Sequence, residues 1–466
     1  MADPAIPNDG RSANDAAQRE LLTGWGRTAP STADVTHPLN TGELAAGLSD
    51  PPARGVLPRG LGRSYGDSAQ NAGGRVLDTT AVSGVISFDP DAGTLTVLAG
   101  TSLDALMRWF VPRGFFVPVS PGTRYVTIGG AIANDIHGKN HHIKGSFSNH
   151  VRSLTLATPA DGIVTVTPEL DPELFWATAG GLGLTGVILD ATFDLPRIET
   201  SRTIVDTTRT KDLDEVMALM ESGDAAYEYS VAWIDLTATG ARMGRSILDR
   251  GRFARLDELP PTLRRDPLSY DARQLVSAPP WVPPKLLNPV TIRAWNELWY
   301  RKSPKRRSGH LMTIPQYFHP LDMIRGWNAM YGPRGFLQWQ IVVPFGAEET
   351  LRGIISELVS DGYGSGVTVL KRFGAGNNGP LSFPQPGWTL TVDFTTETPG
   401  LGPMLDRLDE RVVEAGGRLY FAKDSRMRAD LVPAMYPRIA EWRAVRERVD
   451  PKGVLRSDLA RRLDLC

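Results

Sequence analysis

Cysteine is almost absent from this chain of 466 residues, since the only one is the last residue, Cys466. A disulfide framework and a cysteine-based metal site are therefore both excluded. No apolar run approaches the roughly 20 residues that span a bilayer, and the N-terminal segment lacks a basic stretch followed by an apolar one. We therefore expect neither a transmembrane helix nor a secretory signal. Net charge is also lacking, because 51 basic residues nearly cancel 52 acidic ones, which argues against a nucleic-acid partner.

The length and composition favour two domains with many turns. A chain of 466 residues exceeds what one hydrophobic core usually serves, and 47 glycines with 36 prolines indicate turns more than disorder. Short strand-like runs alternate with glycine turns between residues 54 and 190, interrupted by helical periodicity at residues 102–110. Longer strands are expected further on, at residues 229–235, 336–344 and 388–394. We predict an α+β fold.

Two glycine-rich loops are the most informative feature of the sequence. The first is PRGLGRSYGDS at residues 58–68, and the second combines SPGT at residues 120–123 with IGGAIAN at residues 128–134. Glycine tolerates positive φ angles and lets the backbone approach a ligand closely, while consecutive N–H groups in such a loop can bind a pyrophosphate. The two loops together predict a dinucleotide site.

A third glycine segment, GLGLTG at residues 181–186, matches the Rossmann pattern G-x-G-x-x-G in letters only. A Rossmann fingerprint follows a strand and opens a helix. Here a helical pattern at residues 172–177 comes before the glycines and a strand comes after them. We interpret the segment as a tight turn near the edge of another ligand and not as an NAD site.

Three of the seven histidines lie together in residues 134–142, NDIHGKNHH. No HExxH motif or cysteine partner accompanies them, so a loop that lines a ligand is favoured over a metal site. His137 directly follows the second glycine loop and is the candidate to lie beside a bound ring. A purely structural hydrogen bond is the alternative for this histidine.

Polar side chains alternate with apolar ones in the strand expected at residues 336–344. Gln338 and Gln340 share one face, opposite Leu337, Trp339 and Ile341. A sheet with one polar face of this kind can line a pocket.

A lysine interrupts an apolar face near the C-terminus. If residues 417–424 form a strand, Lys423 shares a face with Leu419 and Phe421. A lysine in this setting either extends its amine to solvent or is functional. If it is desolvated, its pKa falls and it can act as a base or bind an anion.

One segment breaks the balance of charge. Residues 241–310 contain 15 lysines and arginines against 6 acidic residues, with several prolines and the tryptophans Trp281, Trp295 and Trp299. We expect a long, mobile excursion from the second domain. A solvated basic loop is one interpretation. A lid or a membrane-surface contact is the other, because basic residues attract anionic headgroups and tryptophan prefers the membrane interface.

Taken in order, these motifs resemble the vanillyl-alcohol-oxidase type of FAD flavoproteins. More narrowly, the chain resembles the family of oxidase subunits of the actinobacterial decaprenylphosphoryl-β-D-ribose 2′-epimerases. The resemblance covers nearly the whole chain. The segments that carry it lie at residues 62–69, 134–142, 331–340, 380–384, 419–426 and 456–461.

The resemblance implies a two-domain fold of the vanillyl-alcohol-oxidase (PCMH) type. Residues 1–197 and 415–466 would close around FAD, and residues 198–414 would form a substrate domain on an antiparallel sheet. Some members of this superfamily attach FAD through a histidine in the first loop, where this chain has Arg63, so noncovalent FAD is expected. By position, the cofactor would be held by Arg59, Gly60, Leu61, Gly62, Arg63, Ser64, Tyr65, Gly66, Asp67, Ser68, Gly122, Thr123, Thr127, Ile128, Gly129, Gly130, Asn134, Asp135, Ile136, His137, Val187 and Tyr420.

The implied reaction removes a hydride from C2′ of a ribofuranosyl phospholipid, as the first half of an epimerisation for cell-wall arabinan synthesis. Lys423 and His137 are the candidates to take the hydroxyl proton, with Tyr65 as a hydrogen-bonding wall. Thr389 and Thr391 stand where mycobacterial relatives carry asparagine and cysteine. The substrate pocket would be formed by Trp233, Tyr317, Gln338, Gln340, Lys371, Thr389, Thr391 and Lys139, and either lysine could meet the phosphate.

The resemblance also implies a separate NADH-dependent keto-reductase as partner and peripheral contact with a membrane. Without a signal, we expect a cytoplasmic protein or one peripheral to the inner membrane, although related enzymes are placed in the cell envelope. Two other functions fit the sequence. One is an FAD oxidase of a free alditol, aldose or aldonolactone, and the other is a non-catalytic flavoprotein scaffold.

Overall fold

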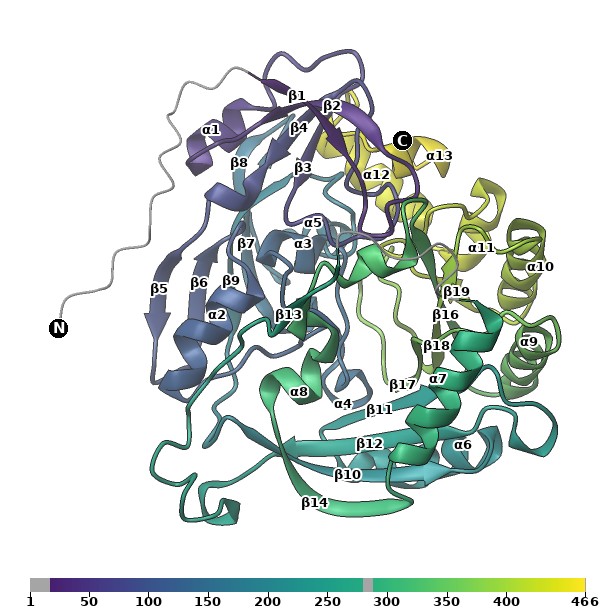
Figure 1. The fold of residues 1–466 in the computed structure, drawn as a ribbon. Helices are drawn as coiled ribbons and strands as arrows, with labels where there is room; N and C mark the ends of the chain where they lie inside the picture. The colour runs from purple at the N-terminus through teal and green to yellow at the C-terminus, as the bar shows by residue number, and fades with distance from the viewer. Residues whose placement is uncertain (1–16, 280–287, 466) are drawn as a thin grey trace.

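The structure, a computed structural model, describes residues 17–279 and 288–465. Trp281 and Cys466 lie outside the described residues. Within the described residues, three large β-sheets and one two-stranded sheet, with helices packed beside them, make up the molecule (Figure 1). The expected strands at residues 229–235, 336–344 and 388–394 are present within one residue at each end, so the α+β prediction is confirmed.

Two sheets form from the first 200 residues. In the four-stranded sheet the order is β1 (Gln18–Leu22), β2 (Ser31–Thr36), β4 (Arg75–Asp78) and β3 (Val56–Arg59). The antiparallel five-stranded sheet has the order β5 (Val85–Asp89), β6 (Thr94–Leu98), β9 (Val187–Asp194), β7 (Val151–Thr158) and β8 (Gly162–Val166). The C-terminal segment joins the first sheet, because the N–H of Val56 donates to the carbonyl of Val454 and that of Arg456 donates to Val56.

The helices beside these two sheets pack through apolar faces. In α2 (Leu103–Phe110), the side chains of Leu103, Leu106, Met107 and Phe110 are all buried, as the helical periodicity predicts, and Ser102 caps the first turn. The other helices of this part are α1 (Thr41–Ala46), α3 (Ile128–Ala133), α4 (His141–Lys144), α5 (Pro172–Thr178), α11 (Val432–Met435), α12 (Ile439–Val449) and α13 (Asp458–Arg462).

An antiparallel eight-stranded sheet forms from the remainder of the chain. Its strand order is β14 (Arg306–Thr313), β10 (Arg202–Thr210), β12 (Ser246–Phe253), β11 (Tyr229–Ile234), β17 (Thr368–Phe373), β18 (Gly387–Thr395), β16 (Phe336–Pro344) and β19 (Arg418–Leu419). The division of the chain after residues 197 and 414 stays a prediction. β19 lies beyond residue 414 and still pairs with β16.

The outer face of this sheet is covered by α6 (Leu213–Gly223), α9 (Glu348–Ser360) and α10 (Leu401–Glu414) (Figure 1). On β16, Trp339 points to this covered side, where its indole N–H donates to Asp409 of α10 at 2.8 Å. Alternation in a strand then places Gln338 and Gln340 on the opposite face. Because both glutamines line a cavity, the prediction of a polar pocket-lining face is confirmed.

The basic segment at residues 241–310 is not one mobile excursion, and that prediction is wrong for much of its length. β12 and β14 are strands of the eight-stranded sheet, each paired with β10 along most of its length. The backbone hydrogen bonds of the ladder hold them in place regardless of their arginines. Between these strands lie β13 (Val276–Ser277), which pairs with β15 (Ile324–Arg325), and α7 (Pro289–Lys302). α8 (Ile314–Phe318) follows β14.

Within residues 17–279 and 288–465, none of the helices combines the length and the apolar character needed to cross a bilayer.

Candidate active site

A cavity of about 740 Å³ lies between the glycine loops and the polar side of the eight-stranded sheet. Ligand pockets typically measure about 300–1,000 Å³. The predicted cofactor residues that line it are Arg59, Gly60, Leu61, Gly62, Arg63, Ser64, Tyr65, Ser68, Gly122, Thr123, Thr127, Gly129, Gly130, Asn134, Ile136, His137 and Tyr420. The predicted catalytic and substrate residues that line it, besides His137 and Tyr65, are Lys423, Trp233, Tyr317, Gln338, Gln340, Lys371, Thr391 and Lys139.

The first glycine loop lines this cavity and contains N–H groups without a protein acceptor. Among the described residues, the backbone N–H groups of residues 61–64 have no hydrogen-bond acceptor. Gly62 adopts φ +64°, a left-handed conformation that favours glycine. Consecutive free N–H groups in a turn of this kind bind anions such as a pyrophosphate.

The second glycine segment shapes the facing wall. A Cβ atom added to Gly122 would meet no protein atom within 4 Å, so this backbone borders open space in the cavity. The side chain of Thr127 caps α3 by accepting from the N–H of Gly130 at 3.1 Å. Asn134 donates its amide N–H to the carbonyl of Gly130 at 2.8 Å, while its own Oδ1 is buried without a partner in the described structure. That oxygen is available to a donor on a ligand.

These features fit FAD. The cavity is large enough for a dinucleotide, the N–H groups of residues 61–64 suit its pyrophosphate, and the free oxygen of Asn134 suits a ring N–H. The turn at residues 181–186 also contributes, because Leu182, Gly183 and Gly186 line the cavity between α5 and β9. This order of helix, turn and strand is the one that argued against a Rossmann site.

His137 lies at the centre of a polar network on the sheet side of the cavity. Its Nε2 is 2.9 Å from Nε2 of Gln340, and its Nδ1 is 3.2 Å from Nζ of Lys371. Gln340 also donates to Oγ1 of Thr389 at 3.2 Å. Burial, followed by the charges of Lys371 and other nearby groups, lowers the pKa of His137 well below its ordinary value. His137 is therefore neutral and serves as a hydrogen-bonding partner.

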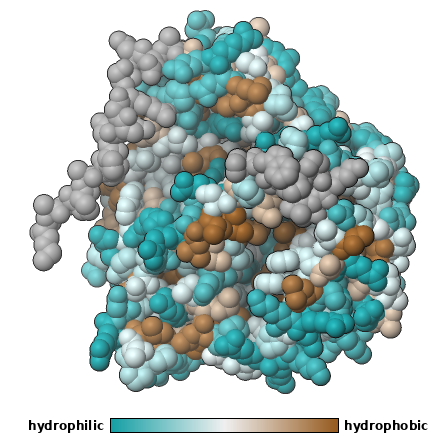
Figure 2. Space-filling model, in the orientation of Figure 1, coloured by the Kyte–Doolittle hydropathy of each residue, from teal (hydrophilic) through white to brown (hydrophobic). Residues whose placement is uncertain are grey.

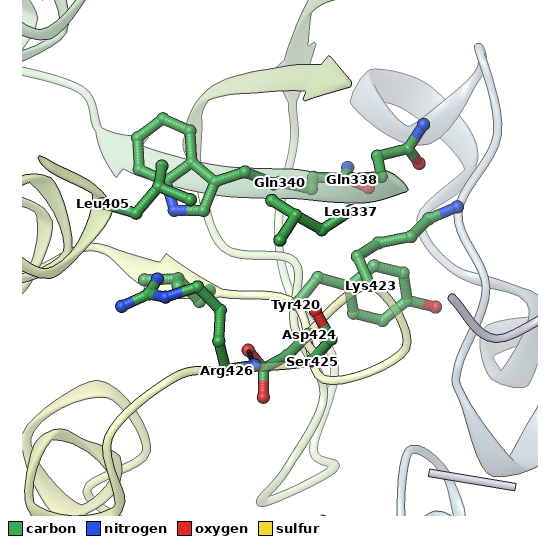
Figure 3. Close-up of a pocket in the computed structure, with 11 residues that line it drawn as sticks. Leu337, Gln338, Gln340, Leu405, Tyr420, Lys423, Asp424, Ser425 and Arg426 are labelled. Atoms are coloured by element: carbon green, nitrogen blue, oxygen red, sulfur yellow. Dashed lines mark hydrogen bonds between the residues drawn. The ribbon is translucent and has the colours of Figure 1, made fainter. Parts of the chain in front are cut away.

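Lys423 lies on a turn and not on a strand, so the prediction from strand alternation is wrong at this point. β19 ends at Leu419, and the N–H of Lys423 then donates to the carbonyl of Tyr420 at 2.9 Å. The turn aims the amine into the cavity, where Nζ lies 3.8 Å from the centre of the Tyr65 ring. Figure 3 shows the amine of Lys423 on the side of Gln338, whereas Asp424 and Arg426 point away from it.

Burial lowers the pKa of Lys423 to about 7, although the nearby carboxylate of Asp393 opposes this shift. Burial, with the charges of Lys139 and Lys423, also lowers the pKa of Lys371 to about 7. Both amines can therefore lose a proton near neutral pH. By pKa, Lys423 and Lys371 both suit a general base at neutral pH, and the amine of Lys371 already contacts Nδ1 of His137 at 3.2 Å.

Asp393, on β18, was not predicted from the sequence. It accepts from the amide of Gln338 at 2.6 Å and from the hydroxyl of Tyr331 at 2.9 Å. Burial raises the pKa of Asp393 to about 6. Its position opposite Gln338 comes from the pairing of β16 with β18, which a single sequence does not reveal.

A second group of polar residues lines the cavity around Lys139. Nζ of Lys139 donates to the carbonyl of Tyr317 and lies 4.3 Å from the centre of that ring. Burial lowers the pKa of Lys139 to about 8, and Asp249 opposes the shift. Asp249 accepts from Thr207 at 2.5 Å and lines the cavity with His310. Asp249 and His310 were not predicted from the sequence, where the only sign of either is a polar residue in a strand.

Some predicted residues lie behind the cavity wall: Gly66, Asp67, Ile128, Asp135, Val187 and Thr389. Asp67 forms two hydrogen bonds with Arg462 of α13, at 2.7 and 3.0 Å. Arg462 also lies 2.8 Å from the carboxylate of Asp424, next to Lys423. The N–H of Tyr65 donates to Ala422 at 2.8 Å. The first glycine loop is thus tied to the turn that carries Lys423.

The other clustered histidines have structural partners. The ring of His141 packs against Phe373, with ring centres 4.4 Å apart, and His142 contacts the carbonyl of Tyr227 at 2.9 Å. No cluster of histidine, cysteine or acidic residues that could hold a metal ion occurs in the part of the chain that the structure describes.

Comparisons with known proteins agree with this geometry. Residues 35–167 match the model of an FAD binding domain, and residues 381–463 match that of D-arabinono-1,4-lactone oxidase. The chain is 49% identical over 449 residues to decaprenylphosphoryl-β-D-ribose oxidase of Mycolicibacterium smegmatis, covering 95% of this chain and 97% of that protein. The chain belongs to the decaprenylphosphoryl-β-D-ribose oxidase family. As a member of this family, it is an FAD-dependent oxidoreductase.

Similarity to other relatives is narrower. An uncharacterized protein in the mprA 5′ region of Streptomyces coelicolor is 40% identical over 373 residues, which is 78% of this chain and all of that protein. Cytokinin dehydrogenase 4 of Arabidopsis thaliana is 30% identical over 154 residues, which is 31% of this chain and 29% of that protein.

Proposed function

We propose that this protein oxidises the 2′-hydroxyl of decaprenylphosphoryl-β-D-ribofuranose to the 2′-keto compound. The observation that carries the proposal is the similarity, over 95% of the chain, to an oxidase named for this ribose lipid. The cavity supports it, because lysines, glutamines and His137 on the sheet side face the loops that suit FAD. The product is the intermediate needed for epimerisation to the arabinose lipid used in cell-wall synthesis.

In this proposal, Lys423 takes the proton of the 2′-hydroxyl. FAD, held by the loops at residues 58–68 and 120–134, would supply the acceptor for the hydride from C2′. The C–H and O–H bonds break, and a carbonyl forms at C2′. His137, held by Gln340 and Lys371, positions the sugar, and Tyr65 supports the amine of Lys423 through its ring.

The remaining residues would bind the sugar phosphate. Lys139 or Lys371 is suited to the phosphate, since each carries a buried amine that lines the cavity. Gln338 and Gln340 are suited to the ribose hydroxyls. Trp233, Tyr317, Thr389 and Thr391 complete the predicted substrate group, with Thr389 acting through its hydrogen bond to Gln340.

We propose further that FAD is held without a covalent bond. Arg63 lies where a covalent superfamily member carries histidine, and a guanidinium is not a nucleophile of this kind. Its guanidinium donates to the carbonyl of Leu61 and lies 4.4 Å from the ring of Trp25. These contacts support a role in shaping the loop around the cofactor.

We also propose an NADH-dependent keto-reductase as the partner, and peripheral contact with the inner membrane. A second enzyme must return hydride to the opposite face of C2′ to complete an epimerisation. The lipid chain of the substrate requires access to a membrane. Fractionation of cells would test the membrane contact and show on which side of the membrane the protein lies.

Anaerobic stopped-flow mixing tests the proposed substrate class. A polyprenylphosphoryl ribose with a short chain should bleach the flavin absorbance much faster than free alditols, aldoses or aldonolactones. The match of residues 381–463 to D-arabinono-1,4-lactone oxidase makes a lactone the sharpest competitor. Faster reduction by the lactone would contradict the proposal and favour a lactone oxidase. A flavin that none of these sugars reduces would favour a non-catalytic flavoprotein scaffold.

We predict that the rate constant of flavin reduction rises with pH through a midpoint near 7, as Lys423, whose pKa is lowered to about 7, loses its proton. In Asp393→Asn the midpoint should move to lower pH, because the carboxylate that favours the charged amine is gone. Asp190→Asn, half-buried on β9 beside Thr155, is the control and should keep the midpoint of the unmodified protein. An unchanged or higher midpoint in Asp393→Asn would contradict the assignment.

A further inference from the structure

α7 packs on the protein through its polar residues. The buried amide of Asn296 donates to Asp235 at 2.9 Å and to the carbonyl of Ser365 at 3.0 Å. Glu297 pairs with Arg245 at 2.6 Å, and the hydroxyl of Tyr300 donates to the carbonyl of Thr210 at 2.9 Å. These contacts fix the helix across the ends of β10, β11, β12 and β17 of the eight-stranded sheet.

The apolar residues of α7 are left exposed. Val290 is 76% exposed, Leu298 61%, Trp295 53% and Trp299 40%. The two tryptophan rings stack with centres 5.9 Å apart and planes inclined by 14°. A surface helix normally turns its apolar stripe to the core. The polarity of α7 is thus reversed, which indicates a partner that is itself apolar.

This exposed face continues into the mouth of the cavity. Trp295 and Trp299 line the cavity, as do Ser303 and Pro304 directly after the helix. A second exposed apolar pair, Leu275 and Val276, lies at β13, whose partner strand β15 follows the cavity residues Pro320 and Leu321. Figure 2 shows hydrophobic groups gathered around the middle of the face on which α7 and β13 lie in Figure 1.

The charges around α7 are mostly positive. Between residues 289 and 307 there are six basic residues and one acidic residue, Glu297, which is already paired with Arg245 and Arg301. The basic side chains of Arg293, Arg301, Lys302, Lys305, Arg306 and Arg307 are all exposed. An anionic headgroup surface complements this charge, and tryptophan side chains favour the same interface.

We propose that α7 docks the protein on an anionic lipid bilayer and brings the cavity mouth to a lipid substrate held in that bilayer. The bilayer covers Val290, Leu298 and the two tryptophans, and its headgroups meet the flanking arginines and lysines. This gives the peripheral membrane contact proposed above a defined surface, and its link to a lipid substrate rests on the proposed oxidation. The choice of α7 as that surface does not rest on the oxidation, because it follows from the exposed apolar residues of the helix and its charge.

The test is flotation of the FAD-loaded protein with vesicles of phosphatidylcholine mixed with phosphatidylglycerol, and with vesicles of phosphatidylcholine alone. The double variant Val290→Glu/Leu298→Glu changes two exposed side chains that do not line the cavity. The matched control is Ile163→Glu/Leu170→Glu, which changes two side chains of similar exposure, 58% and 61%, on the N-terminal part. Flavin reduction by the short-chain ribose lipid, without vesicles, is measured in parallel.

The unmodified protein and the control should float with the anionic vesicles, less so at high salt. The α7 variant should bind at least about tenfold more weakly, through lost apolar contact and added repulsion. Reduction without vesicles should be equal in all three proteins.

Absence of flotation, or equal flotation of the α7 variant, would overturn the docking. A change from dimer to monomer in that variant, without any vesicle binding, would assign the face to a second copy. If the short-chain lipid fails to reduce flavin while flotation occurs, the proposed function fails and the docking stands.

Discussion

Replacing Lys423 by alanine is expected to slow reduction of the flavin by the sugar substrate by about 10²- to 10⁴-fold, the usual contribution of a general base. The amine lines the cavity with a pKa lowered to about 7, so it can accept a proton at neutral pH. FAD should remain bound, because the free N–H groups of residues 61–64 lie on a different segment. Single-turnover absorbance at the flavin band, normalised to bound FAD, measures the effect.

Two further measurements separate the role of a base from a structural role. Lys144→Ala removes an exposed lysine of α4 and should leave the reduction rate unchanged. A small primary amine added to Lys423→Ala should restore part of the rate, since it can occupy the vacated space and take the proton. Reduction of Lys423→Ala at the unmodified rate would remove this residue from the mechanism.

Gly66→Ala is expected to disturb the cofactor loop and the Lys423 turn together. A Cβ atom at residue 66 would lie 1.8 Å from the carbonyl oxygen of Asp424, so the two backbones must move apart. Overpacking of this kind costs about 1–3 kcal/mol of unfolding free energy. The shift would also strain the hydrogen bond from Tyr65 to Ala422 and the Arg462 contacts to Asp67 and Asp424. We therefore expect weaker FAD binding and slower reduction of the flavin that remains.

Urea unfolding and ultrafiltration of free flavin measure the two effects of Gly66→Ala. The control is Gly402→Ala in α10, where an added Cβ atom would meet nothing within 4 Å. A helical glycine replaced by alanine without a clash should be neutral or stabilising. If Gly66→Ala binds FAD and is reduced like the control, the close contact between the two segments has no importance for the site.

The glycine loops and the polar face of β16 could be predicted because they depend on local sequence. Glycine at residue 62 corresponds to a positive φ, and the alternation of Gln338 and Gln340 fixes their shared face. The lysine at residue 423 could be selected by its apolar neighbours. The direction of its side chain could not be predicted, because the strand ends at Leu419 and Lys423 lies on the turn that follows.

Contacts between distant segments escaped the sequence. Asp393 meets Gln338 only because β16 and β18 pair in that register. Arg462 meets Asp67 and Asp424 only because α13 packs beside the first loop. For the basic segment, composition suggested one loop. In the structure, β12 and β14 of this segment pair with β10 and belong to the eight-stranded sheet. Because the buried side chain of Asn296 holds one side of α7 against the protein, the apolar side of that helix is exposed.

The sequence by itself determined the dinucleotide loops, the absence of a disulfide framework and the residues able to act on a sugar, since each depends on residue type and short spacing. The tertiary structure alone decided which of these residues share one cavity, and that α7 exposes its apolar side beside the mouth of that cavity. The physical reason is that burial lowers the pKa of Lys423, and a single sequence does not show which segments bury a residue. The turn that carries Lys423 is held by Tyr65, hundreds of residues away in the chain.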